Sequence, residues 1–192
     1  MIPAVVEEHL RRWYSGFEYC VHAPAQTAQQ RAIAEHVSGY RVAKMVVLKV
    51  DGDMVIAVIA ATDRVNVHPL EEATGARVAL ASEAEFADRF LPCEPGTAPP
   101  MALFGLPIYV DDKLMREPSI VIPAGTREDA AVVRTAEWLW CERVQPLINL
   151  GSRTRVARRS FAGAMAGPGA TREARRRATV PPQRAPCHAP AS

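Results

Sequence analysis

One stretch of the chain limits the possible folds more than any other: two apolar runs rich in β-branched residues, joined by a tight turn. VAKMVVLKV ends at Val50, Asp51-Gly52-Asp53 follows, and MVIAVIAA runs from Met54 to Ala61. Both runs have the length of strands, and Asp-Gly is typical of two-residue hairpin turns. The sequence therefore predicts a β-hairpin over residues 42–61.

Helix signals of several kinds occur around this hairpin. Apolar residues at helical spacing mark residues 4–15, capping boxes open helices at Thr27 and Ser82, a proline in the first turn marks His68, and Thr135 is the predicted N-cap of the last helix. The further expected strands are 17–21, 77–81, 108–110, 119–122 and 131–133. Because strands and helices do not alternate as regular βαβ units, we predict an α+β fold: one domain with a mixed, curved β-sheet and packed helices.

The composition changes after residue 150. Residues 151–192 contain nine arginines, one glutamate and few large apolar residues, whereas residues 1–150 have a net charge of −6. Such a segment cannot bury enough surface to offset the entropy of ordering. We therefore predict a globular domain over residues 1–150 and a disordered Arg/Ala/Pro-rich tail over 151–192, whose deletion leaves the domain folded. The tail either adds sequence-independent phosphate contacts or has no fixed role.

Several classes of protein are disfavoured by the sequence. The apolar runs are shorter than the roughly 18–20 residues that span a bilayer, and the N-terminus lacks a secretory signal, so we expect a cytoplasmic protein without membrane contact. The four cysteines form no C-x-x-C pair, and motifs for nucleophilic triads, phosphoryl transfer and dinucleotides are missing. We expect no metal, no cofactor and, by default, a monomer.

Lys44 is the first candidate for chemistry. The strand period of two places it on the same side as Val46 and Leu48, with Lys49 on the opposite face. A lysine that begins an apolar strand face is expected to line a cleft, where partial desolvation lowers its pKa and strengthens its hold on an anion or a carbonyl. The alternative is a lysine that extends from the sheet edge into water.

Two glycine-containing loops are further candidates. The first, Cys93-Glu-Pro-Gly96-Thr-Ala-Pro99-Pro100, combines a glycine that allows close approach to a ligand with prolines that restrict the loop. Its amides are suited to stabilising an oxyanion. The second, Ala124-Gly125-Thr126-Arg127, offers amides, a hydroxyl and a guanidinium to a phosphate or carboxylate. The alternatives are an ordinary surface loop and an ordinary turn.

Six motifs in order resemble the YbaK family, which includes freestanding trans-editing deacylases and the editing domain of bacterial prolyl-tRNA synthetase. They are His22-Ala-Pro24-Ala-Gln-Thr27-Ala28, Val42-Ala43-Lys44, Leu80-Ala81-Ser82, Cys93-Glu-Pro-Gly96-x-x-Pro99-Pro100, Phe104-Gly-Leu-Pro107-Ile-Tyr-Val-Asp111-x-x-Leu114 and Ala124-Gly125-Thr126. The resemblance covers roughly residues 3–148, which is nearly all of the predicted domain.

This resemblance implies a deacylase that hydrolyses the ester of a mischarged tRNA bearing a small amino acid, with water as nucleophile and Lys44 as the principal catalytic residue. Mischarged tRNA is then the partner, and an aminoacyl-tRNA synthetase a further one. The resemblance also implies a substrate site composed of His22, Thr27, Gly96, Pro99, Pro100, Gly125, Thr126 and Arg127.

The chain departs from the family pattern at several positions, among them Ala60, where a proline is frequent. Met45 follows the lysine where a small polar residue is usual, and Met101 replaces the Phe that often follows the double proline. Pro123 and Arg127 stand where Asn and His flank Ala-Gly-Thr, and both Met101 and Arg127 are expected to touch the pocket. The changes around Met45, Pro123 and Arg127 leave open a second hypothesis: a catalytically weakened module of the same fold that binds tRNA or a synthetase. A third hypothesis assigns the fold no nucleic-acid role.

Overall fold

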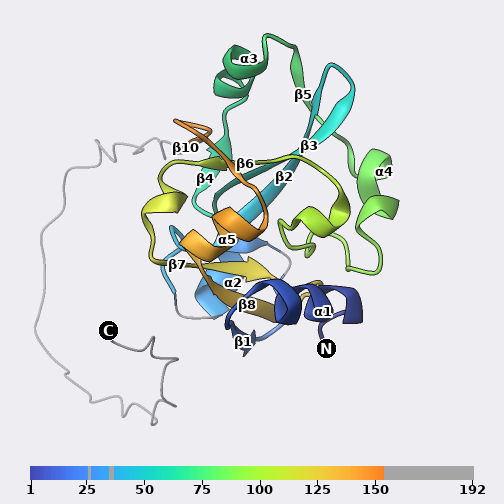
Figure 1. The fold of residues 1–192 in the computed structure, drawn as a ribbon, viewed down its shortest axis with the longest axis vertical. Coiled ribbons are helices and arrows are strands. Elements are labelled where there is room, and N and C mark those ends of the chain that lie inside the picture. The colour runs from blue at the N-terminus through green and yellow to red at the C-terminus, as the bar shows by residue number, and fades with distance from the viewer. Residues whose placement is uncertain (26, 35–36, 154–192) are drawn as a thin grey trace, which may run out of the picture. The chain divides into compact units, whose positions relative to one another are not determined.

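A five-stranded mixed sheet lies at the centre of the structure, a computed structural model that describes residues 1–25, 27–34 and 37–153. Its strands, in spatial order, are β5 (Val78–Leu80), β2 (Ala43–Val50), β3 (Asp53–Ala60), β6 (Ile108–Asp111) and β9 (Gln145–Leu147). β5, β2 and β3 pair antiparallel, while β3, β6 and β9 pair parallel (Figure 1). The predicted α+β fold with a mixed sheet is confirmed.

The predicted hairpin is the longest pairing in this sheet. β2 and β3 are in register from Ala43 opposite Ala60 to Val50 opposite Asp53. The two residues between the strands, Asp51 and Gly52, both have positive φ, at 49° and 101°. Type I′ hairpin turns require this conformation at both central positions, which explains the Asp-Gly dipeptide.

Two smaller sheets complete the β structure. β1 (Glu18–Val21), β8 (Asp129–Arg134) and β7 (Ser119–Pro123) form an antiparallel sheet, and β4 (Asp63–Val65) pairs with β10 (Gly151–Arg153). β4, β9 and β10 have three residues each, and the sequence analysis did not predict them. β10 also lies past the boundary predicted at residue 150, so the described fold extends to Arg153. Residues 154–192, the rest of the predicted tail, lie outside the described residues.

The helices are short and begin where the sequence signals indicated, with one exception. They are α1 (Ala4–Trp13), α2 (Ala28–Ala34), α3 (His68–Thr74), α4 (Glu83–Phe86), α5 (Thr135–Cys141) and the 3₁₀ turns η1 (Ala87–Phe90), η2 (Ala102–Phe104) and η3 (Leu114–Arg116). Both capping boxes form, and α3 ends at Gly75 in the left-handed region. The exception is Thr135: Arg134 is the N-cap of α5, because β8 runs directly into the helix.

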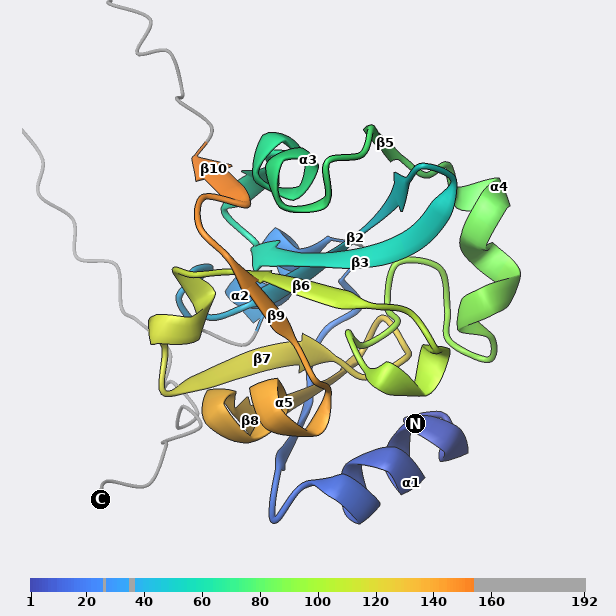
Figure 2. The ribbon, with the colours of Figure 1, turned by 45° about the horizontal axis from the view of Figure 1, so that its top comes forward.

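The side chains of the hairpin pack on both faces of the central sheet. Val47 and Ile56 belong to one buried cluster together with Ile120 of β7, whereas Leu48 and Ile59 pack with Leu70 of α3. Figure 2 shows α3 on one side of the sheet and β7 and β8 on the other. No helix among the described residues is long and apolar enough to cross a bilayer.

Candidate functional site

A cleft of about 460 Å³ lies along an incomplete edge of β2. β5 pairs only with residues 48–50 of this strand, so the first half of β2 has no strand beside it. Because Val50 faces Asp53 across the turn, the N–H and C=O groups of Ala43, Met45 and Val47 point away from β3 and towards this edge. The Val47 carbonyl accepts the Ala81 amide, whereas no described group pairs with the backbone of Met45 on this side. The cleft therefore has an open strand edge as one wall.

Aromatic side chains from α4 and η1 form the opposite wall. Phe86 and Phe90 both line the cleft, and their rings meet edge to face with centroids 5.7 Å apart. Phe90 contacts the buried Phe104 in the same way at 4.9 Å. Lys49 Nζ lies 2.5 Å from Glu85 Oε1, which ties α4 to the sheet. Lys49 and the donors of Ser82 lower the pKa of Glu85 to about 2.

The rim of the cleft contains a tight turn. The Thr97 amide donates to the Glu94 carbonyl, with Pro95 and Gly96 between them. Gly96 has φ of 76°, as type II turns require at this position, and proline is favoured just before it. Gly96 and Ala98 both line the cleft, and among the described residues neither amide donates to a backbone or side-chain acceptor. Two amides with free donor capacity therefore border the cleft.

Gly125 supports this turn from behind. Its amide donates to the Thr97 carbonyl at 2.9 Å, and its carbonyl accepts the Glu94 amide at 2.9 Å. Its φ is 96°, and a Cβ there would lie 2.6 Å from a side-chain carbon of Pro3. Only glycine allows this conformation and this close approach. Gly125 therefore shapes the wall of the cleft without lining it.

Lys44 lines the cleft near the start of β2, and its amine donates to the backbone carbonyl of Asp63 in β4. The side chain is half-buried. Partial burial lowers the pKa of Lys44, and the Arg64 charge lowers it further, while the Asp63 carboxylate opposes both. An ammonium with one donor held by Asp63 retains two donors for a substrate.

Other ionisable groups also reach the cleft. Arg31 of α2 is buried at its edge, and three acidic side chains, Glu83, Asp88 and Glu94, lie around it. Cys93 lines the cleft too, but burial raises the pKa of its thiol to about 11. A thiol with so high a pKa is protonated near neutral pH, and the thiolate is the nucleophilic form. Covalent catalysis by Cys93 is therefore disfavoured.

Three of the nine predicted site residues, Lys44, Thr27 and Gly96, line this cleft. Thr27 reaches it because the preceding segment runs beside the β7–β8 loop. The His22 amide donates to the Glu128 carbonyl, and the Ala25 amide to the Arg127 carbonyl. The His22 ring is buried and its Nδ1 lies 2.7 Å from the Ala23 carbonyl oxygen, so this side chain supports the segment rather than lining the cleft.

The remaining predicted residues are not among those that line the cleft. Pro99 and Pro100 are buried, and the Pro100 carbonyl accepts the Trp138 indole N–H. Thr126 forms a local turn in which its hydroxyl donates to Asp129 and accepts two backbone amides. The Arg127 amide donates to the Glu94 carboxylate at 2.9 Å.

One expectation about the departures from the family pattern is wrong. Met101 is fully buried in the main core and does not line the cleft. Arg127 is exposed, and its Nε lies 3.9 Å from Oε2 of Glu94, a residue that lines the cleft. Met101 was expected at the pocket because it follows the double proline, but η2 begins just after it and turns the chain inward. By contrast, Met45 and Pro123 do line the cleft.

Three residues that line the cleft were not predicted from the sequence: Phe86, Phe90 and Arg31. The capping box at Ser82 marks the start of α4, which contains Phe86, and Phe90 follows in η1. An apolar helix face more often indicates core packing than a ligand site. In the described ranges, no cluster of three or more His, Cys, Asp or Glu side chains is arranged to hold a metal ion.

Comparison with known proteins gives two kinds of match. A family model described as an aminoacyl-tRNA editing domain matches residues 22–140. Among curated proteins, no sequence matches significantly. Solved structures share the fold at low identity. One is a scaffold protein used for computational epitope grafting, with TM-score 0.68, 19% identity, and coverage of 78% of this chain and 96% of that chain. Another, proposed to be a trans-editing enzyme for prolyl-tRNA synthetase, has TM-score 0.65, 18% identity, and coverage of 77% and 98%.

Proposed function

Because the chain belongs to the aminoacyl-tRNA editing domain family, we propose that it is a deacylase that hydrolyses the ester of a tRNA charged with the wrong amino acid. The observation that supports this most directly is Lys44: a half-buried ammonium on the open edge of β2, within a cleft of about 460 Å³. A ligand site of this volume is at the small end of the usual range. It has to admit the terminal ribose as well, so we propose a small amino acid such as alanine or cysteine.

In the proposed reaction, water attacks the ester carbonyl and the C–O bond to the ribose breaks. The ribose hydroxyl leaves with a proton, and the free amino acid retains the oxygen of water. The developing oxyanion is stabilised by the Lys44 ammonium and by the Gly96 and Ala98 amides, which border the same cleft. An aminoacyl ester is already activated, so positioning and oxyanion stabilisation suffice without a covalent intermediate.

The apolar walls have a second role in this proposal. Phe86, Phe90 and Met45 restrict the volume beside the lysine and exclude water from it. In such a site an ammonium interacts more strongly with a developing negative charge than it does in bulk water. The proposed partner is mischarged tRNA, with an aminoacyl-tRNA synthetase as a further partner, which implies a cytoplasmic site of action.

The test compares two lysines of one strand. We expect Lys44→Met to slow the release of amino acid from a panel of mischarged tRNAs by about 100-fold or more, the cost of removing one oxyanion donor. The matched control is Lys49→Met, which removes a lysine that contacts Glu85 outside the cleft. We expect this variant to retain the wild-type rate within about threefold.

The same measurement distinguishes the proposed deacylase from the alternative hypothesis. A catalytically weakened module would bind tRNA without releasing any amino acid from the panel, and Lys44→Met would then have no rate to lower. The departures that favour this alternative and reach the cleft are Met45 and Pro123. Restoring a small polar residue at Met45 and recovering hydrolysis would support a weakened enzyme over the active deacylase proposed here.

A further inference from the structure

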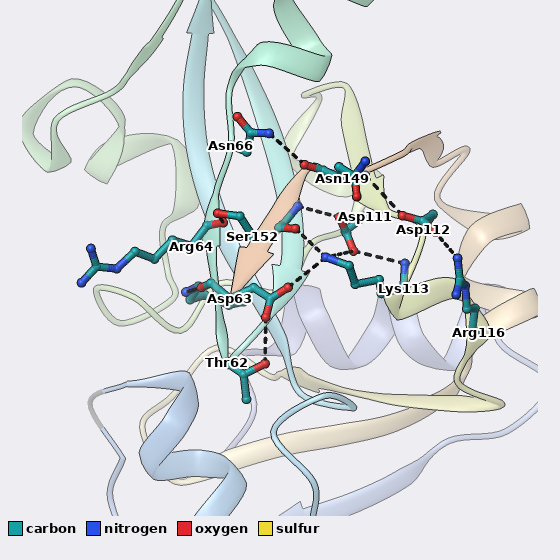
Figure 3. Close-up of polar contacts among 12 residues, drawn as sticks. Thr62, Asp63, Arg64, Asn66, Asp111, Asp112, Lys113, Arg116, Asn149 and Ser152 are labelled. Carbon is teal, nitrogen blue, oxygen red and sulfur yellow. Dashed lines mark hydrogen bonds and ion pairs between the residues drawn. The ribbon is translucent and has the colours of Figure 1, made fainter. Parts of the chain in front are cut away.

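A cluster of charged side chains lies beside Lys44, away from the cleft itself. It consists of Asp63 of β4, Asp111 at the end of β6, Lys113 in the turn that follows, and the backbone of Gly151 in β10. We call these four residues the clasp. Figure 3 shows Lys113 between the two carboxylates, with β10 passing alongside.

The contacts of the clasp join three segments that are far apart in the sequence. Lys113 Nζ donates to the Gly151 carbonyl at 2.6 Å and lies 3.4 Å from Asp63 Oδ2 and 3.8 Å from Asp111 Oδ1. The Gly151 amide donates to Asp111 Oδ2 at 2.5 Å. Both carboxylates are almost fully buried, at 2% and 1% exposure. Buried carboxylates are stable only when they are paired in this way, so the contacts constrain one another.

Gly151 permits this arrangement because it has no side chain. A Cβ there would lie 3.0 Å from Asp63 Oδ2 and 3.3 Å from Asp111 Cγ. β10 therefore passes close enough for both of its Gly151 backbone groups to bond to the clasp. β10 is also the strand that pairs with β4, from Asp63 opposite Arg153 to Val65 opposite Gly151.

The clasp reaches Lys44 through the backbone of β4. The acceptor of the Lys44 amine is the main-chain carbonyl of Asp63, whose side chain belongs to the clasp. The position of this carbonyl depends on the contacts that hold β4, which include its pairing with β10 and the contact of Lys113 with Asp63. We propose that the clasp positions Lys44 for catalysis, with Asp63, Lys113 and Gly151 as positioning residues. This inference rests on the proposed deacylase function.

The test uses a feature of the composition. The chain contains three lysines, Lys44, Lys49 and Lys113, so the NMR spectrum of protein labelled with ¹³C-lysine is simple. In Lys113→Met only the signals of Lys44 and Lys49 remain. The matched control is Arg116→Met, which removes a cation from the same turn whose ion pair with Asp112 lies on the surface. We expect Lys113→Met to lower kcat about 10- to 100-fold with a smaller change in KM, since small displacements of a catalytic group have effects of this size. Arg116→Met should remain near the wild type.

The NMR signal of Lys44 reports on the clasp independently of turnover. The charged groups around Lys44 are Asp63 and Arg64 of β4, Arg31 of α2, and the cleft carboxylates Glu83, Asp88 and Glu94. Loss of the Lys113 charge removes a cation that shares the Asp63 carboxylate with Lys44, so the Lys44 signal should move and its pKa should rise. Lys113→Arg, which retains the bridging cation, should restore both kcat and the signal.

Equal kcat and equal Lys44 signals in Lys113→Met and Arg116→Met would overturn the proposal while leaving the deacylase function intact. If no mischarged tRNA is hydrolysed by the wild type, the deacylase function fails, and an unchanged Lys44 signal would overturn the clasp as well. If Lys113→Met does not fold, Gly151→Ala serves instead, because its Cβ would press directly on both carboxylates.

Discussion

The clasp and the end of α5 both contain buried carboxylates, but these carboxylates have partners of different kinds. The clasp contains Asp63 and Asp111, and Glu142 follows α5 directly. The two aspartates share an ammonium, Lys113, whose side chain is 39% exposed. Glu142 accepts from the Tyr14 hydroxyl at 2.7 Å and from the Ala102 amide at 2.6 Å, and the His9 Nε2 lies 2.8 Å away. We call Glu142 and these three partners the hub.

The difference has a functional consequence. The hub joins α1, α5 and η2, and none of its members lines the cleft that contains Lys44. The dense packing of the hub raises the pKa of Tyr14, through burial first and then through the Glu142 carboxylate. The clasp holds β4, which bonds to the Lys44 amine. Changes in the hub should therefore reduce stability alone, whereas changes in the clasp should also reduce activity.

The largest expected effect comes from removing β10. A chain that stops after Leu150 loses both Gly151 contacts of the clasp and the strand that pairs with β4. We expect its deacylase rate to fall about 100-fold or more, whereas a chain that stops after Thr154 retains β10 and should remain active. Circular dichroism and amino acid release would be measured for both chains.

This pair of truncations also tests the boundary predicted at residue 150. Full activity of the chain that stops after Leu150 would support that boundary and would show that the site does not need β10. If the longer chain alone is active but binds tRNA more weakly and with a flatter salt dependence than the full chain, the arginines beyond Thr154 contribute phosphate contacts.

Glu142→Ala should have the next largest effect, on stability alone. The substitution leaves a buried tyrosine hydroxyl and a backbone amide without their acceptor, so we expect the free energy of unfolding to fall by about 3 kcal/mol. The control is Glu7→Ala, which removes an exposed pair with Arg11 on α1 and should cost less than about 1 kcal/mol. Urea denaturation measures both. A large loss of kcat in folded Glu142→Ala would contradict the separation between hub and clasp.

Neither cluster was predicted from the sequence, although much of the fold was. The hairpin, both capping boxes and the end of α3 at Gly75 depend on residues within a few positions of one another, and local patterns report such features. The clasp joins residues 63, 111, 113 and 151, whose proximity results from tertiary packing. β4 and β10 have three residues each, too few for a period of two to be visible.

The site was predicted in the same uneven way. Lys44 was a candidate because it begins an apolar strand face, which is a local signal, and the family resemblance made it the predicted catalytic residue. His22 and Thr126 lie in the expected segments, but their side chains bond locally, to the Ala23 carbonyl and to Asp129, and do not line the cleft. Pro146 lies in β9, an edge strand, where a missing amide donor is tolerated.

The smallest expected effect comes from an ion pair that is close to the cleft but exposed, and it shows whether burial or closeness to the cleft decides the effect of a charge. Glu85 lies next to the cleft wall but is exposed, and its pKa is about 2 against an ordinary value of 4.5. Because the folded pKa is the lower one, the contacts of Glu85 stabilise the fold above pH 4.5, and this stabilisation disappears as the pH falls through about 2. In Lys49→Met we expect the pKa of Glu85 to rise part of the way, since the Ser82 amide and hydroxyl still donate to it. Titration of its side-chain carboxyl by ¹³C NMR measures the change, and an unchanged pKa would show that the capping box alone sets it.

The same variant, Lys49→Met, should leave kcat near the wild-type value, because an exposed ion pair is weak. A marked loss of kcat would mean that α4 must be tied to the sheet for the cleft to function.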